Sequence, residues 1–320
     1  MCIRLLKTGK EAAMPEKRAL VFTPVDFADY DKIFPYTSAY GEGSCQHSPV
    51  SMISQAEKYG DSVCIQDGFL YTLRSHLCDE AYRVYLSPLG EGNLHAAFGF
   101  VLADAKSQGK KAKFVSLTER TAAELERAFP GRFHLVEDPD LAEYMYLTRI
   151  MSTFSGHALK KRREEVRAFW RMYSERAAVS AIGPGDIEDI LSYEQKWLAA
   201  NKETHDMHAL KREERMIRLQ MTHFDKLHLS GIVLRIDGEI AGFGYGTRLS
   251  GQFYDAIAEK GNKQVPHIYK VLRQESVKQC AMDCEYVNME EDVGVPGLRA
   301  LKRAYQPAYL LRKIIATERD

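Results

Sequence analysis

Two Asp-Gly pairs, Asp67-Gly68 and Asp237-Gly238, stand at the same point of a pattern that runs twice through this chain. Each pair separates two short runs rich in β-branched and aromatic residues, at 63–65 and 69–74 in the first half and at 232–236 and 239–246 in the second. Asp-Gly favours the two-residue turn of a β-hairpin because both residues accept the positive φ that this turn requires. The sequence therefore predicts the same hairpin in each half.

The elements after each hairpin also match in type and order. They are a third strand, a helix, a fourth strand, a second helix that ends near a proline, and a last strand. In the first half the pattern predicts them around 82–86, 94–107, 113–117, Pro130 and 133–136, and in the second around 253–258, 265–279, 285–289, Pro307 and 308–315. Agreement over so many elements indicates an internal duplication. We therefore expect an α+β protein with two units, each a mixed, mostly antiparallel sheet flanked by helices.

The length of 320 residues suits two domains of about 130–150 residues better than one hydrophobic core. Hydrophobic residues make up 45% of the chain and aromatic residues 10%, which is typical of a folded globular protein. We expect an N-terminal extension at 1–16, a first domain at 17–150, a basic linker helix at 151–175, and a second domain with the candidate site at 176–320.

No segment approaches the ~20 consecutive apolar residues that a membrane-spanning helix requires. The first seven residues contain too short an apolar run for a secretory signal. We therefore expect a soluble, cytoplasmic protein.

The residues that commonly bind metals form no convincing site. The cysteines contain no Cys-x-x-Cys pair, so we expect them to be reduced thiols; they are Cys2, Cys45, Cys64, Cys78, Cys280 and Cys284. Glu203, His205 and His208 are close in sequence but have no evident further ligand, which favours a polar loop. We expect no metal.

The charge of the chain is balanced, with 44 basic and 44 acidic residues, which argues against extensive contact with nucleic acid. Two local groups are nevertheless basic: Lys160, Lys161, Arg162, Arg163, Arg167, Arg171 and Arg176, and then Arg299, Lys302, Arg303, Arg312 and Lys313. Such groups could bind a tRNA backbone, a phospholipid head group or a nucleotide cofactor. The alternative for the first group is a solvated linker helix whose aromatic residues are buried.

The stretch 288–307 combines acids, a tight turn and a short cationic helix. Glu290, Glu291 and Asp292 follow a β-like run, and the glycines and proline at 294–297 favour a turn. The spacing of apolar residues then predicts a helix over 298–305. Acids at the end of a strand, opposite cations on the next helix, could hold a polar or zwitterionic substrate. The alternative is a solvated acidic turn followed by an amphipathic helix.

This stretch resembles the C-terminal signature of the bacterial phosphatidylglycerol lysyltransferase C-terminal domain family, which includes stand-alone members of unknown function. The residues that carry the resemblance are Asp292, Gly294, Gly297-Leu298-Arg299, Lys302, Tyr305 and Pro307. It extends more loosely through Ser155-Gly156-His157 and 160–163 to about Tyr144. The resemblance implies two tandem GNAT-like (acyl-CoA N-acyltransferase-like) units. It also implies transfer of an aminoacyl or acyl group, with aminoacyl-tRNA as one donor, to an amine or hydroxyl of a lipid head group or small molecule.

The GNAT fold implies where the site should lie. Its fourth and fifth strands splay apart, and here that gap would fall between 253–258 and 286–289. We expect Tyr254 and Asp255 on one wall and Asn288 and Glu290 on the other. Glu290 or Asp292 would act as base or hold an ammonium group, while Arg299 and Lys302 would stabilise carbonyl or phosphate oxygens. Lys302 matches a motif position that lines the cavity, and Glu213 or Glu214 is a further candidate.

Two alternatives to aminoacyl transfer stay open. In acyl-CoA-dependent enzymes a glycine-rich loop binds the pyrophosphate, and Gly90 and Gly92 could form such a loop. The neighbouring Ser87, Pro88 and Glu91 depart from that pattern. The other alternative is a catalytically idle GNAT-like binding module.

Overall fold

The computed structural model describes residues 19–200 and 207–320. The expected N-terminal extension at 1–16 and two residues of the candidate metal group, Glu203 and His205, lie outside these ranges. Among the described helices, none is both long and apolar enough to cross a membrane.

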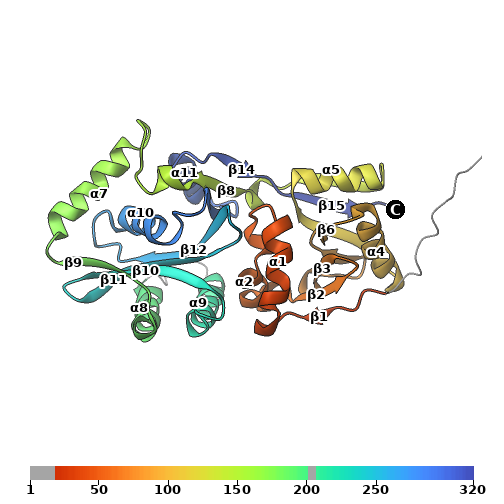
Figure 1. Ribbon diagram of the computed structural model, residues 1–320, viewed down its shortest axis with the longest axis horizontal. Helices are drawn as coiled ribbons and strands as arrows, with labels where there is room; N and C mark the ends of the chain where they lie inside the picture. Colours follow the sequence, from red (N-terminus) through yellow and green to blue (C-terminus); the bar gives the residue numbers. More distant parts are fainter. Residues whose placement is uncertain (1–18, 201–206) are drawn as a thin grey trace, which may run out of the picture.

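The first sheet is built mainly from the first half of the chain (Figure 1). Its strands lie in the order β1 (Thr23–Pro24), β2 (Asp61–Gln66), β3 (Phe69–Arg74), β4 (Tyr82–Tyr85), β6 (Lys111–Leu117), β15 (Ile314–Glu318) and β7 (Phe133–Glu137), with β5 (Leu89–Gly90) paired to β3. The helices around it are α1 (Tyr30–Tyr40), α2 (Pro49–Ser54), α3 (Ala56–Tyr59), α4 (Leu94–Ser107) and α5 (Glu119–Ala128). Phe98 and Phe114 are fully buried in its core.

The second sheet repeats this arrangement. Its strands lie in the order β9 (Ala177–Ala181), β10 (Leu229–Ile236), β11 (Glu239–Arg248), β12 (Phe253–Gly261), β13 (Tyr286–Glu291), β8 (Glu143–Leu147) and β14 (Tyr309–Leu311). Figure 1 shows α10 (Ile268–Cys280) on one face, and α8 (Ile187–Ala200) and α9 (Met207–Thr222) on the other. The short helices α6 (Thr148–Met151) and α11 (Pro296–Ala304) complete this unit. The tandem GNAT-like α+β fold expected from the sequence is confirmed.

Both predicted hairpins are present, and their turns have the backbone that Asp-Gly favours. Asp67 and Gly68 have φ of 50° and 78°, and Asp237 and Gly238 have φ of 53° and 86°. The strands on either side pair antiparallel. These turns depend on local chemistry alone, which is why the sequence predicts them well.

The two units exchange their last strands. β8 comes from the first half of the chain but pairs with β13 and β14 of the second sheet. β15 comes from the C-terminus but pairs with β6 and β7 of the first sheet. The prediction of one last strand over 308–315 is therefore wrong, because β14 and β15 belong to different sheets. Because of this exchange, the domain boundaries expected at 150 and 176 do not separate the strands of the two sheets.

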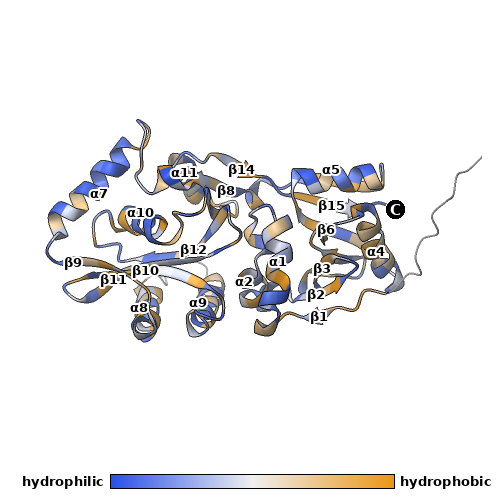
Figure 2. Ribbon diagram, in the orientation of Figure 1, coloured by the Kyte–Doolittle hydropathy of each residue, from blue (hydrophilic) through white to orange (hydrophobic). Residues whose placement is uncertain are grey.

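The basic segment expected as a linker helix forms α7 (Lys160–Tyr173), which connects β8 and α6 to β9. Phe169 is fully buried and Val166 nearly so, in the core that α7 shares with α10. The rest of α7 is mostly hydrophilic (Figure 2). α7 thus packs against the second unit, and Figure 1 shows it at the outer end of that unit.

We predict that the C-terminal strand exchanges its amide hydrogens as slowly as the core strands do. β15 is hydrogen-bonded on both sides, and Ala316 is fully buried, so its amides should open only when the first sheet unfolds. Hydrogen exchange followed by mass spectrometry should show protection of 314–318 close to that of β6 and well above that of the edge strand β9. Rapid exchange of 314–318 would mean that β15 is only loosely docked.

Candidate functional site

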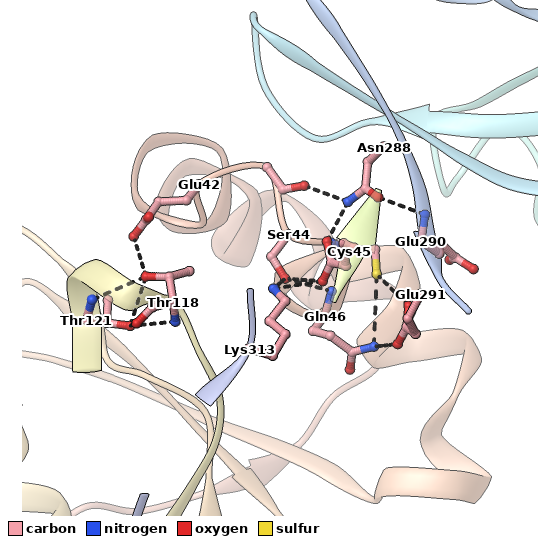
Figure 3. Close-up of polar contacts among 12 residues, drawn as sticks. Glu42, Ser44, Cys45, Gln46, Thr118, Thr121, Asn288, Glu290, Glu291 and Lys313 are labelled. Carbon is pink, nitrogen blue, oxygen red and sulfur yellow. Dashed lines mark hydrogen bonds and ion pairs between the residues drawn. The ribbon is translucent and has the colours of Figure 1, made fainter. Parts of the chain in front are cut away.

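A buried carboxylate joins the two units at the point where the exchanged strands begin, and Figure 3 shows its partners Ser44, Asn288 and Lys313. Glu143, the first residue of β8, is fully buried. Its Oε1 accepts hydrogen bonds from Ser44 Oγ and Lys313 Nζ, each at 2.8 Å. Its Oε2 accepts from the Cys45 main-chain N–H at 3.0 Å and from Asn288 Nδ2 at 2.5 Å. One side chain therefore holds a loop of the first unit, a strand of the second, and the crossover between β14 and β15.

Lys313 is the cation of this junction. It lies between β14 and β15, is fully buried, and also donates from Nζ to Ser44 Oγ at 2.6 Å. Burial alone would raise the pKa of Glu143, but Lys313 and the donated hydrogen bonds outweigh it and lower that pKa. Glu143 is therefore ionised at neutral pH.

The loop that carries Ser44 and Cys45 is tied to both units. Glu42 accepts a hydrogen bond from Thr118, which caps α5, at 3.0 Å (Figure 3). Gly43 has φ of 74°, and a Cβ placed on it would lie 2.4 Å from the Phe253 ring at the start of β12. A glycine is needed here both for the backbone conformation and for this close approach.

Asn288 connects this junction to a bulge in β13. Its Nδ2 also donates to Gly43 O at 2.9 Å, and its Oδ1 accepts from the Glu290 main-chain N–H at 2.7 Å. The pairing with β8 shifts register between Asn288 and Glu291, and Glu290 has φ of 55°. A left-handed non-glycine residue in a bulge is a strained feature of the kind that occurs at functional sites.

Lys302 of α11 holds the outer side of this bulge. Its Nζ donates to three successive main-chain carbonyls, those of Met289 at 2.6 Å, Glu290 at 3.1 Å and Glu291 at 2.7 Å. Burial lowers the pKa of Lys302, and the nearby acids Glu290 and Glu291 oppose that shift. Lys302 therefore fixes the bulge that presents Glu290.

Arg299 and Asp292 hold the turn between β13 and α11. The guanidinium of Arg299 donates to both oxygens of the fully buried Asp292, at 2.8 and 2.7 Å, and to Asp140 at 2.6 Å. Asp292 also accepts from the Tyr144 hydroxyl at 2.6 Å and the Gly294 main-chain N–H at 3.0 Å. The hydrogen bond from Arg299 holds the pKa of Asp292 far below its usual range. These contacts are structural, and neither residue lines the cavities described below.

The expected gap between strands lies beside this bulge. β12 and β13 pair in parallel only from Phe253–Tyr286 to Asp255–Asn288, and a cavity of about 240 Å³ lies where they diverge. Residues 256–259 and 289–291 line its two sides, together with Tyr146, Arg273, Leu298, Leu301, Lys302 and Tyr305. The Tyr254 hydroxyl donates a hydrogen bond to the Ser230 carbonyl at 3.0 Å, and Tyr254 does not line this cavity.

Glu290 and Glu291 line this cavity, and a third acid, Asp255, is buried near them without lining it. Burial, followed by the charge of Glu291, raises the pKa of Glu290 to about 8. Burial and the neighbouring acids, Glu290 first, raise the pKa of Asp255 well above its usual range. Asp255 is 2% exposed, and its Oδ1 has no hydrogen-bond partner. Among the described residues, no lysine or arginine forms an ion pair with any of the three.

A second and larger cavity meets the first at the same acids. It measures about 750 Å³ and lies between the α2–α3 segment of the first unit and α9 of the second. Glu290, Glu291 and Leu298 line both cavities. Glu213 also lines the larger one, where its carboxylate accepts from Lys260 at 2.8 Å. Glu290 and Glu291 therefore lie between the two cavities.

The loop proposed for acyl-CoA has a structural role. Leu89–Gly90 is strand β5, and Gly90 pairs with Phe69 of β3. A Cβ on Gly90 would lie 2.1 Å from Gly68 O, so a glycine is required for packing. Gly92 has φ of 134°, a backbone that glycine adopts readily.

Several residues of the site were not predicted from the sequence. Ser44, Cys45 and Gln46 come from the first unit, and Glu143 from an exchanged strand. Lys313, expected in a basic group that could bind phosphate, is instead fully buried and paired with Glu143. Gln46 Nε2 donates to Glu291 Oε1 at 2.7 Å, and the Cys45 thiol lies 3.6 Å from Glu291 Oε2. Lys313 does leave a signal, since it is a charge between two apolar runs. Over residues 19–200 and 207–320, no cluster of three or more His, Cys, Asp or Glu is arranged to hold a metal ion.

A duplicated GNAT-like fold with an acid-lined gap in its second unit defines the class of protein. The chain belongs to the phosphatidylglycerol lysyltransferase C-terminal family, whose model matches residues 43–317. No curated protein matches it significantly.

Solved structures share this fold. A conserved protein of unknown function from Bacteroides thetaiotaomicron is 26% identical, with a TM-score of 0.88 over 94% of this chain and 100% of that one. The C-terminal domain of a putative lysylphosphatidylglycerol synthetase from Agrobacterium fabrum is 12% identical, with a TM-score of 0.65. L-PGS from Bacillus licheniformis is 16% identical, with a TM-score of 0.61. The match covers 92% of this chain and 92% of the other in both of these cases.

We predict that Lys313→Met lowers the free energy of unfolding by about 3–5 kcal/mol, because it leaves Glu143 charged and buried without its partner. Adding Glu143→Gln should recover part of the loss, since no unpaired charge then remains. The matched control is Arg176→Met, which breaks an ion pair whose side chains are 56% and 53% exposed and should cost less than about 1 kcal/mol. Urea unfolding measures all three. Equal effects at Lys313 and Arg176 would contradict the role of the buried pair.

The raised pKa of Glu290 predicts a pH dependence of stability. Its folded pKa of about 8 lies above its ordinary value of 4.5, so its contribution is fully present below pH 4.5 and is lost as the pH rises through about 8. Urea unfolding between pH 6 and 9 should therefore show a steeper loss of stability in the wild type than in Glu290→Gln. Parallel pH profiles for the two proteins would show that Glu290 titrates normally.

Proposed function

We propose that this protein transfers an aminoacyl group from aminoacyl-tRNA to the amine or hydroxyl of an acceptor, in the gap between β12 and β13. The observation that carries the proposal is the acidic end of this gap, where Glu290 and Glu291 are half-buried and Asp255 is buried. Asp255, Glu290 and Glu291 form no ion pair within the described part of the chain, while Lys313 is paired with Glu143 and Lys302 donates to three carbonyls. Such a site favours a ligand that brings a positive charge of its own.

An aminoacyl ester is a ligand of that kind. It carries a free α-ammonium group beside its reactive carbonyl, whereas the acyl group of an acyl-CoA such as acetyl-CoA has no cation. An ammonium held by Glu291 and Glu290 would form charge-assisted hydrogen bonds at a half-buried site. Gln46 and Cys45 keep Glu291 in place for this contact.

The transfer then needs a group that accepts one proton. The acceptor's oxygen or nitrogen attacks the ester carbonyl, a new ester or amide bond forms, and the bond to the tRNA ribose oxygen breaks. Glu290 in its ionised form takes the proton from the acceptor and returns it to the leaving ribose hydroxyl. A base with a pKa near 8 suits this task because it can both accept and release a proton close to neutral pH.

The two cavities suit two substrates. We assign the aminoacyl group to the smaller cavity between the strands and the acceptor to the larger cavity between the units, because both open onto Glu290 and Glu291. The acceptor would be a lipid head group or a small amine or alcohol. The hydrophilic face of α7 (Figure 2), which includes basic residues such as Lys160, Lys161 and Arg167, is our candidate surface for tRNA.

The family supports the same reaction class. Its name describes the transfer of a lysyl group to phosphatidylglycerol, and the chain matches its model over 43–317. The alternative of an acyl-CoA donor has less support, since Leu89–Gly90 is engaged in pairing with β3.

We expect purified protein to move label from aminoacyl-tRNA, charged with a mixture of radioactive amino acids, to a component of a total lipid extract or a mixture of small amines. Glu290→Gln should reduce this transfer at least about 100-fold, in the range typical of losing a general base. Glu239→Gln is the control, because Glu239 is an exposed acid on the neighbouring strand β11. The proposal fails if label moves from acetyl-CoA but not from aminoacyl-tRNA, or if Glu290→Gln transfers as well as the control.

A further inference from the structure

The charges that line the smaller cavity carry an inference about the donor's side chain. We infer that the cavity between β12 and β13 accepts aminoacyl groups with uncharged side chains, and that Arg273 is the specificity-determining residue that excludes a second ammonium. This inference rests on the function proposed above, because it concerns the same site. It separates a neutral aminoacyl donor from a lysyl donor.

Arg273 and Glu259 neutralise each other on the cavity wall. The guanidinium of Arg273 donates to Glu259 Oε1 at 3.1 Å and Oε2 at 2.8 Å, and the two side chains are 14% and 15% exposed. Arg273 also lies over the Tyr305 ring, 4.5 Å from its centroid. Both Arg273 and Glu259 line the cavity. A bidentate pair with an aromatic support is rigid, so Glu259 is not available to a ligand cation.

The other charged residues of the cavity can balance the charge of one ligand cation. Among the residues that the structure describes, five charged ones line the cavity, and two of them are Arg273 and Glu259. The other three are Glu290, Glu291 and the cation Lys302, whose Nζ donates to main-chain carbonyls. With both glutamates ionised, this group has one negative charge in excess. The α-ammonium of an aminoacyl group balances it, and a second ammonium would have no counter-charge.

The rest of the wall, as far as the described residues form it, has no carboxylate for a second ammonium. It consists mainly of apolar and aromatic side chains, among them Ile257, Met289, Leu298 and Leu301. The Tyr146 hydroxyl is already engaged, donating to Lys302 O at 2.8 Å. An ε-ammonium in this cavity of about 240 Å³ would lose its water and meet the guanidinium of Arg273.

The test compares two ligands that differ mainly in the second ammonium. Norleucinamide and lysinamide have the same chain length and the same α-ammonium, and neither carries a carboxylate. In titration calorimetry the wild-type protein should bind norleucinamide at least about tenfold more tightly, as expected when a site leaves one buried charge unpaired. Alaninamide, as a smaller neutral probe, should bind as well.

Variants identify the residue responsible. Arg273→Gln frees Glu259 and should shift the preference toward lysinamide by about tenfold or more. Arg273→Gln combined with Glu259→Gln should restore the preference for norleucinamide, because the cavity is again balanced. Lys278→Gln is the matched control, since it breaks an exposed ion pair with Glu275 on the same helix and should leave the ratio unchanged. Thermal unfolding checks that each variant is folded.

The outcomes separate this inference from the proposed function. If wild-type protein binds lysinamide as tightly as norleucinamide or more so, the inference is wrong and aminoacyl transfer still stands. If the ratio does not change in folded Arg273→Gln, Arg273 is not the determinant. If none of the three amides binds and no aminoacyl group is transferred, the proposed function itself fails.

Discussion

The buried ion pair between Glu143 and Lys313 is the interaction on which the arrangement of the two units depends. Removing both charges from water costs several kcal/mol per ion, so the pair is stable only because its geometry and hydrogen bonding are complete. Glu143 accepts from four donors, and Lys313 donates to both Glu143 and Ser44. The pair lies where β8 enters the second sheet and the chain leaves β14 for β15. It therefore joins the two exchanged strands at their crossing and makes each unit dependent on the other.

The candidate site follows from this junction through a short series of contacts. Glu143 holds Asn288, whose side chain accepts from the main chain of Glu290. Lys302 donates to the carbonyl of Glu290 and to those of both its neighbours. The first unit has the same backbone feature, since Ser116 has φ of 57° where β6 bulges against β15. There the residue is a serine, and Phe114, at the position of Asn288, is buried in the core. The duplication thus preserves the bulge in both units, and the acids occupy it only in the second.

The sequence predicts well what depends on neighbouring residues. The Asp-Gly hairpins and the helix at 94–107 arise from local turn chemistry and periodicity, and the gap between β12 and β13 is a property of the fold. The exchange of β8 and β15 could not be predicted, because apolar runs such as 144–147 and 309–316 do not specify which distant strand they will pair with. The partners of Arg299 and Asp292 depend on Tyr144 and Asp140, which reach the turn only through this exchange. Sequence spacing placed these charges in the correct region but could not decide whether they face a substrate or each other.

The raised pKa of Glu290 connects ligand binding to catalysis under the proposed function. Without a cation nearby, burial and Glu291 keep this carboxyl largely protonated at neutral pH, and a protonated carboxyl cannot act as base. An α-ammonium that enters the gap favours the ionised form of Glu290, since an opposite charge within a few ångströms lowers the pKa of a carboxyl. Binding of the donor would then ionise Glu290, which acts as the base in the transfer. An acyl group without an ammonium would leave Glu290 protonated. The acidic end of the gap would in this way act both in recognition and in activation, with one cation serving both.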